Sequence, residues 1–288
     1  MIDKIDTTRR KILKTGLIGA VAGGSLISGV SLYKVREARA AAAVHPYGYY
    51  PGELDADASR QLAYDSFFGV YIDKAKHSGC AFATFHALIS QLAELHPDGP
   101  YGQIPTPMME WAAGGVAGYG SICGTLNGAG AALGLICANA QAKSMIGDLL
   151  NWSATTLLPT RLSENNLTVP NERSYELEQS ISGGNLCHMS VTNWCLATGY
   201  ASGSEQRIER CARLAGDVAA RVVDMLNGVV VPAATAPVDK TSCGQCHKSG
   251  TDFDAGQFTL GRMDCTTCHI ELEKVPEKGH WSVIRKPE

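Results

Sequence analysis

The chain has 288 residues, of which 45% are hydrophobic and 18% are charged, and its formal net charge is −3. These values exclude a disordered chain and a multi-span membrane protein, and the slight acidity disfavours binding to nucleic acid. The length is enough for one large domain or two small ones with a real hydrophobic core.

Residues 1–43 have the pattern of an export signal. Arg9 and Arg10 precede a moderately apolar, glycine-rich run over 16–32, and Ala38-Arg39-Ala40 offers a small-x-small cleavage site. The pattern predicts a twin-arginine signal peptide, a periplasmic location and no stable membrane span after cleavage. An uncleaved anchor over 17–33 is the alternative, although the glycines and serines of that run weaken its apolar character.

Cleavage would leave an acidic mature protein with 17 basic and 25 acidic residues. Such a surface favours solubility and can steer a basic redox partner. The twin-arginine route exports folded proteins, often with a cofactor already inserted, whereas c-type haem is attached only after export. We therefore expect a folded body that holds one cofactor and a separate segment that holds haem.

Residues 44–228 predict an all-α, cysteine-rich domain, because apolar residues recur at helical spacing and strand-like alternation is nowhere sustained. The expected helices cover 55–76, 80–95, 176–199 and 205–227, with a further segment that begins near Met108.

That further segment is unusually rich in glycine over residues 114–137. Gly124, Gly128 and Ala132 recur every four residues, as do Gly130 and Gly134. Helix faces without side chains let a neighbouring helix or a cofactor approach the backbone, which must offset a helix cost of roughly 1 kcal/mol per glycine.

Residues 229–242, rich in proline and alanine, predict a linker, and 243–288 predict a di-haem segment with little regular structure. That segment contains two Cys-x-x-Cys-His motifs. In such a motif each cysteine forms a thioether to a haem vinyl group and the histidine binds the iron as the proximal ligand. The motifs are Cys243, Cys246 and His247, then Cys265, Cys268 and His269.

A four-thiolate zinc site is the alternative reading of the same four cysteines, whose C-x2-C-x18-C-x2-C spacing suits it. A histidine directly after each pair is not required by zinc, and the segment 248–264 lacks the strand pattern of a zinc ribbon. The sequence therefore favours two covalently bound haems c.

Six further cysteines lie in the helical domain, and in an exported protein they can form disulfides or stay free in the core. If Cys123 and Cys137 share one helix they are about 21 Å apart, and Cys187 and Cys195 are similarly about 12 Å apart. One small cluster can then use one member of each pair. We select Cys123 and Cys187, which with Cys80 and Cys211 supply the four ligands of an iron-sulfur cluster, expected to be [2Fe-2S].

Two of these four cysteines have a particular local context. Cys80 follows Gly79 at an expected helix N-terminus, where the helix dipole lowers a thiol pKa. Cys211 shares a helix face with Ile208, Ala215 and Val218, so an ordinary core role is equally open for it.

Four short motifs resemble a family of redox-active proteins named for its Cys-x-Gly-Cys-Ala motif. They are Ser78-Gly79-Cys80-Ala81, Cys123-Gly124-Thr125-Leu126-Asn127-Gly128-Ala129, Cys187-His188-Met189-Ser190-Val191 with Trp194, and Glu209-Arg210-Cys211-Ala212. With the two terminal haem motifs, nearly the whole mature chain resembles the split-Soret cytochromes c of sulfate-reducing bacteria. It departs from the wider family at His77, where that family has a first cysteine.

The resemblance implies a homodimer with closely spaced bis-histidine haems, an axial histidine that crosses between subunits, and an iron-sulfur centre in the body. The expected distal ligands are His280, which lies in the haem segment, His188, which adjoins Cys187, and His45, which lies on an irregular arm. The other candidates are His77, His86 and His96, and Met189 or Met263 would raise the potential.

We therefore expect a periplasmic electron-transfer protein that exchanges electrons with redox protein partners, because irons with two protein ligands leave no open position for a substrate. The alternative is a redox enzyme that reduces a small substrate at an open haem or at the cluster. A third hypothesis is a structural dimer or filament module in which haem fastens subunits together.

Overall fold

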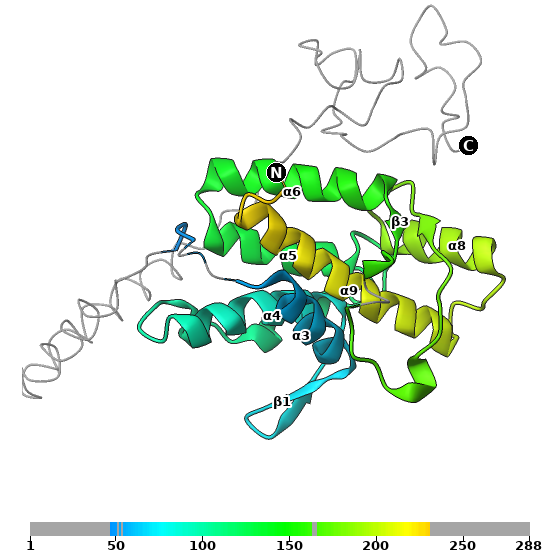
Figure 1. The fold of residues 1–288 in the computed structure, drawn as a ribbon, viewed down its shortest axis with the longest axis horizontal. Helices are drawn as coiled ribbons and strands as arrows, with labels where there is room; N and C mark the ends of the chain where they lie inside the picture. The colour runs from blue at the N-terminus through cyan, green and yellow to red at the C-terminus, as the bar shows by residue number, and fades with distance from the viewer. Residues whose placement is uncertain (1–46, 51, 53, 163–165, 231–288) are drawn as a thin grey trace, which may run out of the picture. The chain divides into compact units, whose positions relative to one another are not determined.

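The computed structural model describes residues 47–50, 52, 54–162 and 166–230, which form a helical body (Figure 1). Helices dominate it, and the two small sheets have two short strands each. The all-α prediction is therefore confirmed for this part of the chain. No helix among these residues is long and apolar enough to cross a membrane.

Helix α3 (Ala56–Phe68) begins at Asp55, whose side chain accepts a hydrogen bond from the Ala58 amide at 2.7 Å. It ends at Gly69, where φ is 121°. A hairpin of β1 (Val70–Ile72) and β2 (Ala75–His77) follows. The predicted helix over 55–76 is therefore wrong from Gly69 onward.

The turn of this hairpin explains the error. It consists of Asp73 and Lys74, with φ of 50° and 70°. Two consecutive positive φ values are typical of the tight turn that joins antiparallel strands. Asp-Lys lacks the glycine that normally marks such a turn, so the sequence pattern gave no warning of it.

Helix α4 (Cys80–Leu95) has the predicted bounds and ends at His96, just before Pro97. Its sequence is almost entirely apolar, and most of its residues are buried. Two 3-10 helices follow, η1 (Tyr101–Gln103) and η2 (Thr106–Ala112). Both η1 and η2 contact α4, so this connection closes one side of the core.

The glycine-rich segment forms α5 (Gly124–Ile136), and a break at Cys137 and Ala138 separates it from α6 (Asn139–Thr155). No separate helix was expected at the position of α6. Its face toward the body carries Met145 and Leu149, which belong to the main core. These few apolar positions are spaced among polar residues, which makes the helix inconspicuous in the sequence.

The segment after α6 is largely irregular. It contains β3 (Leu157–Leu158), η3 (Asn171–Arg173) and β4 (Ser180–Ile181), and β3 pairs with β4. Helix α8 (Cys187–Thr198) then ends at Gly199, which is left-handed with φ of 76°. The predicted helix over 176–199 is therefore correct only from Cys187 onward.

Helix α9 (Glu205–Leu226) agrees with the prediction to within one residue. The Ser204 hydroxyl caps its N-terminus by accepting a hydrogen bond from the Arg207 amide at 3.2 Å. It contacts α3, α4, α5 and α6 and crosses the middle of the body (Figure 1). Residues 209–220 are all buried, including several charged ones, so α9 is the central helix of the fold.

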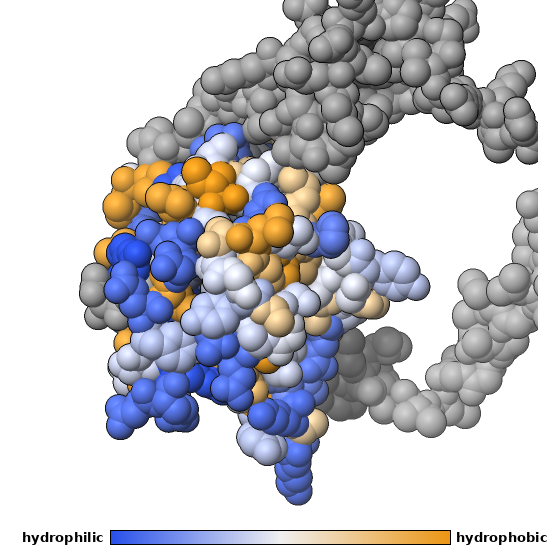
Figure 2. Space-filling view, turned by 90° about the vertical axis from the view of Figure 1, so that its right-hand side faces the viewer, coloured by the Kyte–Doolittle hydropathy of each residue, from blue (hydrophilic) through white to orange (hydrophobic). Residues whose placement is uncertain are grey.

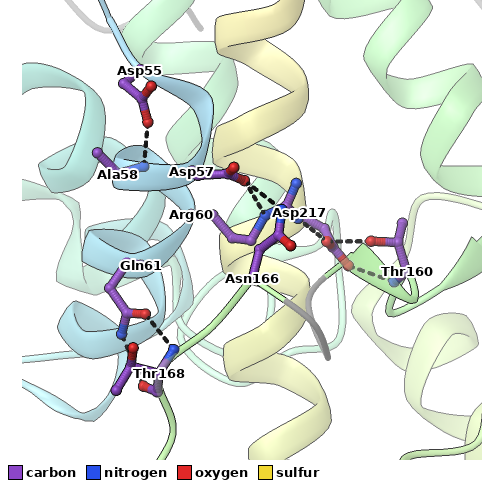
Figure 3. A network of polar contacts seen from close by, with 9 residues as sticks. All are labelled: Asp55, Asp57, Ala58, Arg60, Gln61, Thr160, Asn166, Thr168 and Asp217. Atoms are coloured by element: carbon purple, nitrogen blue, oxygen red, sulfur yellow. Dashed lines mark hydrogen bonds and ion pairs between the residues drawn. The ribbon is translucent and has the colours of Figure 1, made fainter.

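A polar network joins α9 to α3 inside this core. Arg60 of α3 pairs with Asp217 of α9, and the Thr160 amide and hydroxyl donate to the same carboxylate, each at 2.6 Å (Figure 3). Arg60 and Asp217 are 5% and 2% exposed, so their charges must compensate each other. The network therefore fixes where the loop after β3 meets the two helices.

Candidate metal centre

Four cysteines from separate segments meet at one end of the helical body. Cys80 is the first residue of α4, Cys123 directly precedes α5, Cys187 is the first residue of α8 and Cys211 lies within α9. Each of the six pairs among them interacts electrostatically. The structure thus brings together the four cysteines that were selected from the sequence.

Backbone pairing holds two of these cysteines in place. Ile122 and Leu186 form an isolated antiparallel bridge. Beside it, the Cys123 amide donates to the Asn185 carbonyl at 2.8 Å, and the Cys187 amide donates to the Ser121 carbonyl at 2.7 Å. The helices α5 and α8 therefore begin side by side, and their first turns carry the two thiols to the same site.

Close helix packing supplies the third cysteine. A Cβ atom placed on Gly124 would lie 2.6 Å from the Cys80 Cβ, and one on Gly128 would collide with the Ala81 backbone. The face of Gly124 and Gly128 is therefore the surface on which α4 rests. Gly134, on the second predicted glycine face, has no atom within 4 Å of such a Cβ, so that face is not used for close packing.

Burial governs the acidity of these thiols. It raises the pKa of Cys80 and of Cys123, and it raises that of Cys187 to about 11. The prediction that the helix dipole lowers the Cys80 pKa is wrong, because burial raises that pKa instead. Desolvation and three neighbouring sulfurs outweigh the dipole, because the thiol is enclosed even though the residue keeps some exposed surface.

The other two cysteines lie elsewhere. Cys137 follows the far end of α5, where its thiol contacts the Met145 sulfur at 3.8 Å, and burial raises its pKa to about 11. Cys195 lies eight residues after Cys187 on α8. All six cysteines of the described residues are free thiols, so the disulfide alternative finds no pair here.

The four cysteines can be compared with the ligand sets of known kinds of metal centre. Tetrahedral zinc with Zn–S bonds of about 2.3 Å needs sulfurs about 3.8 Å apart. Among the described residues, no group of three or more His, Cys, Asp or Glu side chains is arranged to hold one metal ion. Four cysteine sulfurs are the donor set that a [2Fe-2S] or [4Fe-4S] cluster takes.

One residue of the site has a role that the sequence did not reveal. Arg210, next to Cys211, is 1% exposed, and its positive charge acts to lower the thiol pKa of Cys123 and Cys187. The sequence motif that contains Arg210 was recognised, but the burial of Arg210 was not expected, because arginines are usually exposed. The available signal was its position on one helix face with Arg213 and Asp217, in a segment where the other side chains are mainly small and apolar.

The histidines of the body differ in how far their rings are engaged. His86 donates to or accepts from the Thr106 hydroxyl at 2.8 Å and stacks on Phe82, with ring centroids 5.0 Å apart. The His77 Nδ1 lies 3.2 Å from a Glu110 carboxylate oxygen. His188 is exposed at the start of α8, directly beside the cysteine site.

The remaining predicted site residues lie outside the described part of the chain. They are His45, Cys243, Cys246, His247, Cys265, Cys268, His269 and His280.

Comparison with known proteins gives consistent results. The family of redox-active proteins named C_GCAxxG_C_C matches residues 79–225. The split-Soret cytochrome c of Desulfovibrio desulfuricans is 32% identical over 281 residues, which cover 90% of this chain and 94% of that protein. A solved structure described as a novel iron centre in that organism's split-Soret cytochrome c superposes with a TM-score of 0.63 at 30% identity. It covers 80% of this chain and 91% of that one.

Proposed function

Because this chain belongs to the split-Soret cytochrome c family, a family of redox cytochromes, we propose that it carries electrons with two kinds of iron cofactor. In this proposal two haems c are bound through Cys243, Cys246, Cys265 and Cys268, with His247 and His269 as proximal ligands. A [2Fe-2S] cluster is bound by Cys80, Cys123, Cys187 and Cys211. When bound, these groups supply one-electron chemistry.

The observation that carries the proposal is the convergence of four thiols from four distant segments. Cys80 and Cys211 lie 131 positions apart in the sequence, yet they interact electrostatically in the fold. Burial raises the pKa of Cys80, Cys123 and Cys187, and a metal centre that binds these sulfurs as thiolates would offset that cost. The iron centre named for the homologous structure supports the same interpretation.

In this proposal the protein residues hold the iron cofactors in fixed positions and shield them. The Ile122–Leu186 bridge and the Gly124 contact fix the positions of three sulfurs, and a fixed site costs little reorganisation when an electron arrives. Distal histidines would leave the haem irons without an open position, which favours electron transfer over substrate reduction.

Location and assembly form part of the proposal. The twin-arginine pattern of residues 1–43 supports export to the periplasm, where haem c is attached. A homodimer is expected, with redox proteins as partners. Figure 2 shows the side of the body on which α8 lies, where apolar patches are interspersed among polar ones.

Chemical analysis of the purified protein tests this function. Mass spectrometry is expected to show two covalent haem adducts on the C-terminal segment and loss of about the first 43 residues. Iron and sulfide analysis with Mössbauer spectroscopy should give non-haem iron and inorganic sulfide besides the haem iron. Reduced protein should fail to bind carbon monoxide. Zinc with no visible absorbance would overturn the proposal, and tight binding of carbon monoxide would favour the redox enzyme.

A further inference from the structure

Arg210 is buried against the four-cysteine site without a carboxylate partner. It is 1% exposed, and its Nη2 donates to the Ser190 hydroxyl at 2.8 Å. Its Nη1 lies 4.0 Å from the Cys211 sulfur. Its Nε has no hydrogen-bond partner, and no ion pair of Arg210 occurs within the part of the chain that the structure describes.

The other buried arginines of this region are all neutralised. Arg213, one turn further along α9, pairs with Glu209 at 2.8 Å, and Arg60 pairs with Asp217. Arg221, which is partly buried, pairs with Asp148 at 3.1 Å. Within the described part of the chain, Arg210 is therefore buried without the counter-ion that Arg213 and Arg221, on the same helix, each have.

A lone buried cation is costly, because desolvation of a charge is repaid only by an opposite charge or by several hydrogen bonds. Arg210 points at the sulfur of Cys211, and its charge also reaches Cys123 and Cys187. No carboxylate among the described residues pairs with it. The group that these sulfurs hold is the candidate for the counter-ion.

We propose that Arg210 is the counter-ion of the iron-sulfur cluster and raises its reduction potential. This inference rests on the proposed function. Four thiolates and two sulfides around two Fe³⁺ ions have a net charge of −2. Reduction by one electron from a redox partner converts one Fe³⁺ to Fe²⁺ and makes the charge −3. Arg210 remains a fixed cation throughout and attracts the more negative state more strongly.

The geometry gives Arg210 a second effect. Its guanidinium spans from Ser190 on α8 to Cys211 on α9, and Ser190 lies one helical turn after Cys187. Charge-assisted N–H donation to sulfur or sulfide stabilises the electron-rich form and raises the potential of such centres. Arg210 is thus a tuning residue that acts on the cluster through charge and hydrogen bonding.

The test compares Arg210→Met, Arg210→Lys and Arg221→Met in the full-length, haem-loaded protein. Arg221 is a matched control, since it lies ten residues along α9 from Cys211, about 15 Å, and has its own partner Asp148. A redox titration followed by electron paramagnetic resonance gives the cluster potential. R210M is expected to lower it by an amount equal to about a tenfold change in the reduction equilibrium, about 59 mV for one electron. R210K should give a smaller decrease, and R221M none.

A second measurement uses protein from which iron and sulfide have been removed. There R210M should leave the thermal midpoint unchanged or raise it, because the substitution removes an uncompensated buried charge. A destabilising effect of R210M in the cluster-free protein would overturn the proposal and assign Arg210 a structural role.

The remaining outcomes separate the two proposals. R210M protein with a full cluster and an unchanged potential overturns the role of Arg210 and leaves the proposed function intact. If R210M lacks the cluster, R210K must retain it, because the lysine keeps the charge. Loss in both variants with native helical circular dichroism overturns the tuning role. Wild-type protein without inorganic sulfide overturns the cluster itself.

Discussion

Gly124 lies against Cys80 with no room for a side chain between them. A Cβ on Gly124 would come within 2.6 Å of the Cys80 Cβ and would also collide with the Ala112 carbonyl oxygen. Gly124 directly follows Cys123, so this single contact sets the spacing between two of the four sulfurs. The absence of one methyl group thereby links the packing of α4 on α5 to the geometry of the metal centre.

We expect Gly124→Ala to destabilise the protein by about 1–3 kcal/mol, the usual cost of overpacking a core. The displaced Cys80 should also lower the amount of non-haem iron and sulfide per chain. Chemical denaturation and iron analysis measure the two effects.

Gly134→Ala on the same helix is the matched control, since nothing lies near its missing side chain. It should retain the cluster and gain roughly 0.5–1 kcal/mol from helix propensity. A G124A protein as stable and iron-rich as the wild type would show that α4 and α5 can separate without cost.

Replacement of single cysteines distinguishes ligands from core residues. Serine at Cys80, Cys123, Cys187 or Cys211 should abolish or strongly reduce the inorganic sulfide content, because in the proposed cluster each supplies one of four terminal ligands. Covalent haem, which we propose is bound to the C-terminal segment, should be unaffected and serves as the internal standard.

Serine at Cys137 or Cys195 provides the comparison for these variants. Cys137 contacts Met145 and Cys195 lies further along α8, so both variants should keep a full complement of sulfide. A Cys137→Ser variant that loses the cluster would contradict the proposed ligand set. The same holds for a Cys211→Ser variant that keeps it.

Two expectations from the sequence have physical reasons that can be named. They are the helices α4 and α9, and the choice of one cysteine from each pair on a shared helix. In α4 a largely apolar segment stops shortly before Pro97, and α9 has a clear capping serine at Ser204. A helix cannot bring Cys123 and Cys137 to one cluster, and the rise per residue alone decides this.

Features that depend on tertiary contacts were not predictable in this way. The hairpin after α3 has a turn without glycine, and the acidity of Cys80 depends on sulfurs that the fold brings from three other segments. The burial of Arg210 likewise follows from the packing of α8 on α9. Local pattern carries no information about such distant neighbours.

His188 offers a test of the haem ligands. It is exposed beside Cys187, and its ring makes no hydrogen bond or ion pair within the described residues, which leaves it able to bind iron. His188→Ala should convert one haem from the low-spin to the high-spin form and allow it to bind carbon monoxide, as seen by optical spectroscopy.

His86→Gln is the control for that experiment, because the His86 ring is already engaged by Thr106 and Phe82. It should keep both haems low-spin. A low-spin, carbon monoxide-inert H188A protein would exclude His188 and leave His280 and His45 as the first distal candidates, ahead of His77 and His96.

The raised pKa of the buried Asp217 leads us to expect that the stability of the protein depends on pH. Burial raises its pKa from 3.8 to about 6, although the Thr160 hydrogen bonds and the charge of Arg60 act in the opposite direction. The folded protein therefore holds this proton more tightly than the unfolded chain between pH 3.8 and 6. Unfolding releases the proton in that range, so the stability from this group falls as pH rises through it.

Between pH 5 and pH 7 the decrease from Asp217 should be roughly 1 kcal/mol. Asp217→Asn cannot titrate, so its stability should lack this decrease while other groups, including Asp224, whose pKa burial also raises, still contribute. Urea denaturation of both proteins at the two pH values gives the difference directly. If the two proteins lose the same stability between pH 5 and pH 7, Asp217 remains ionised throughout. Its pairing with Arg60 would then outweigh its burial.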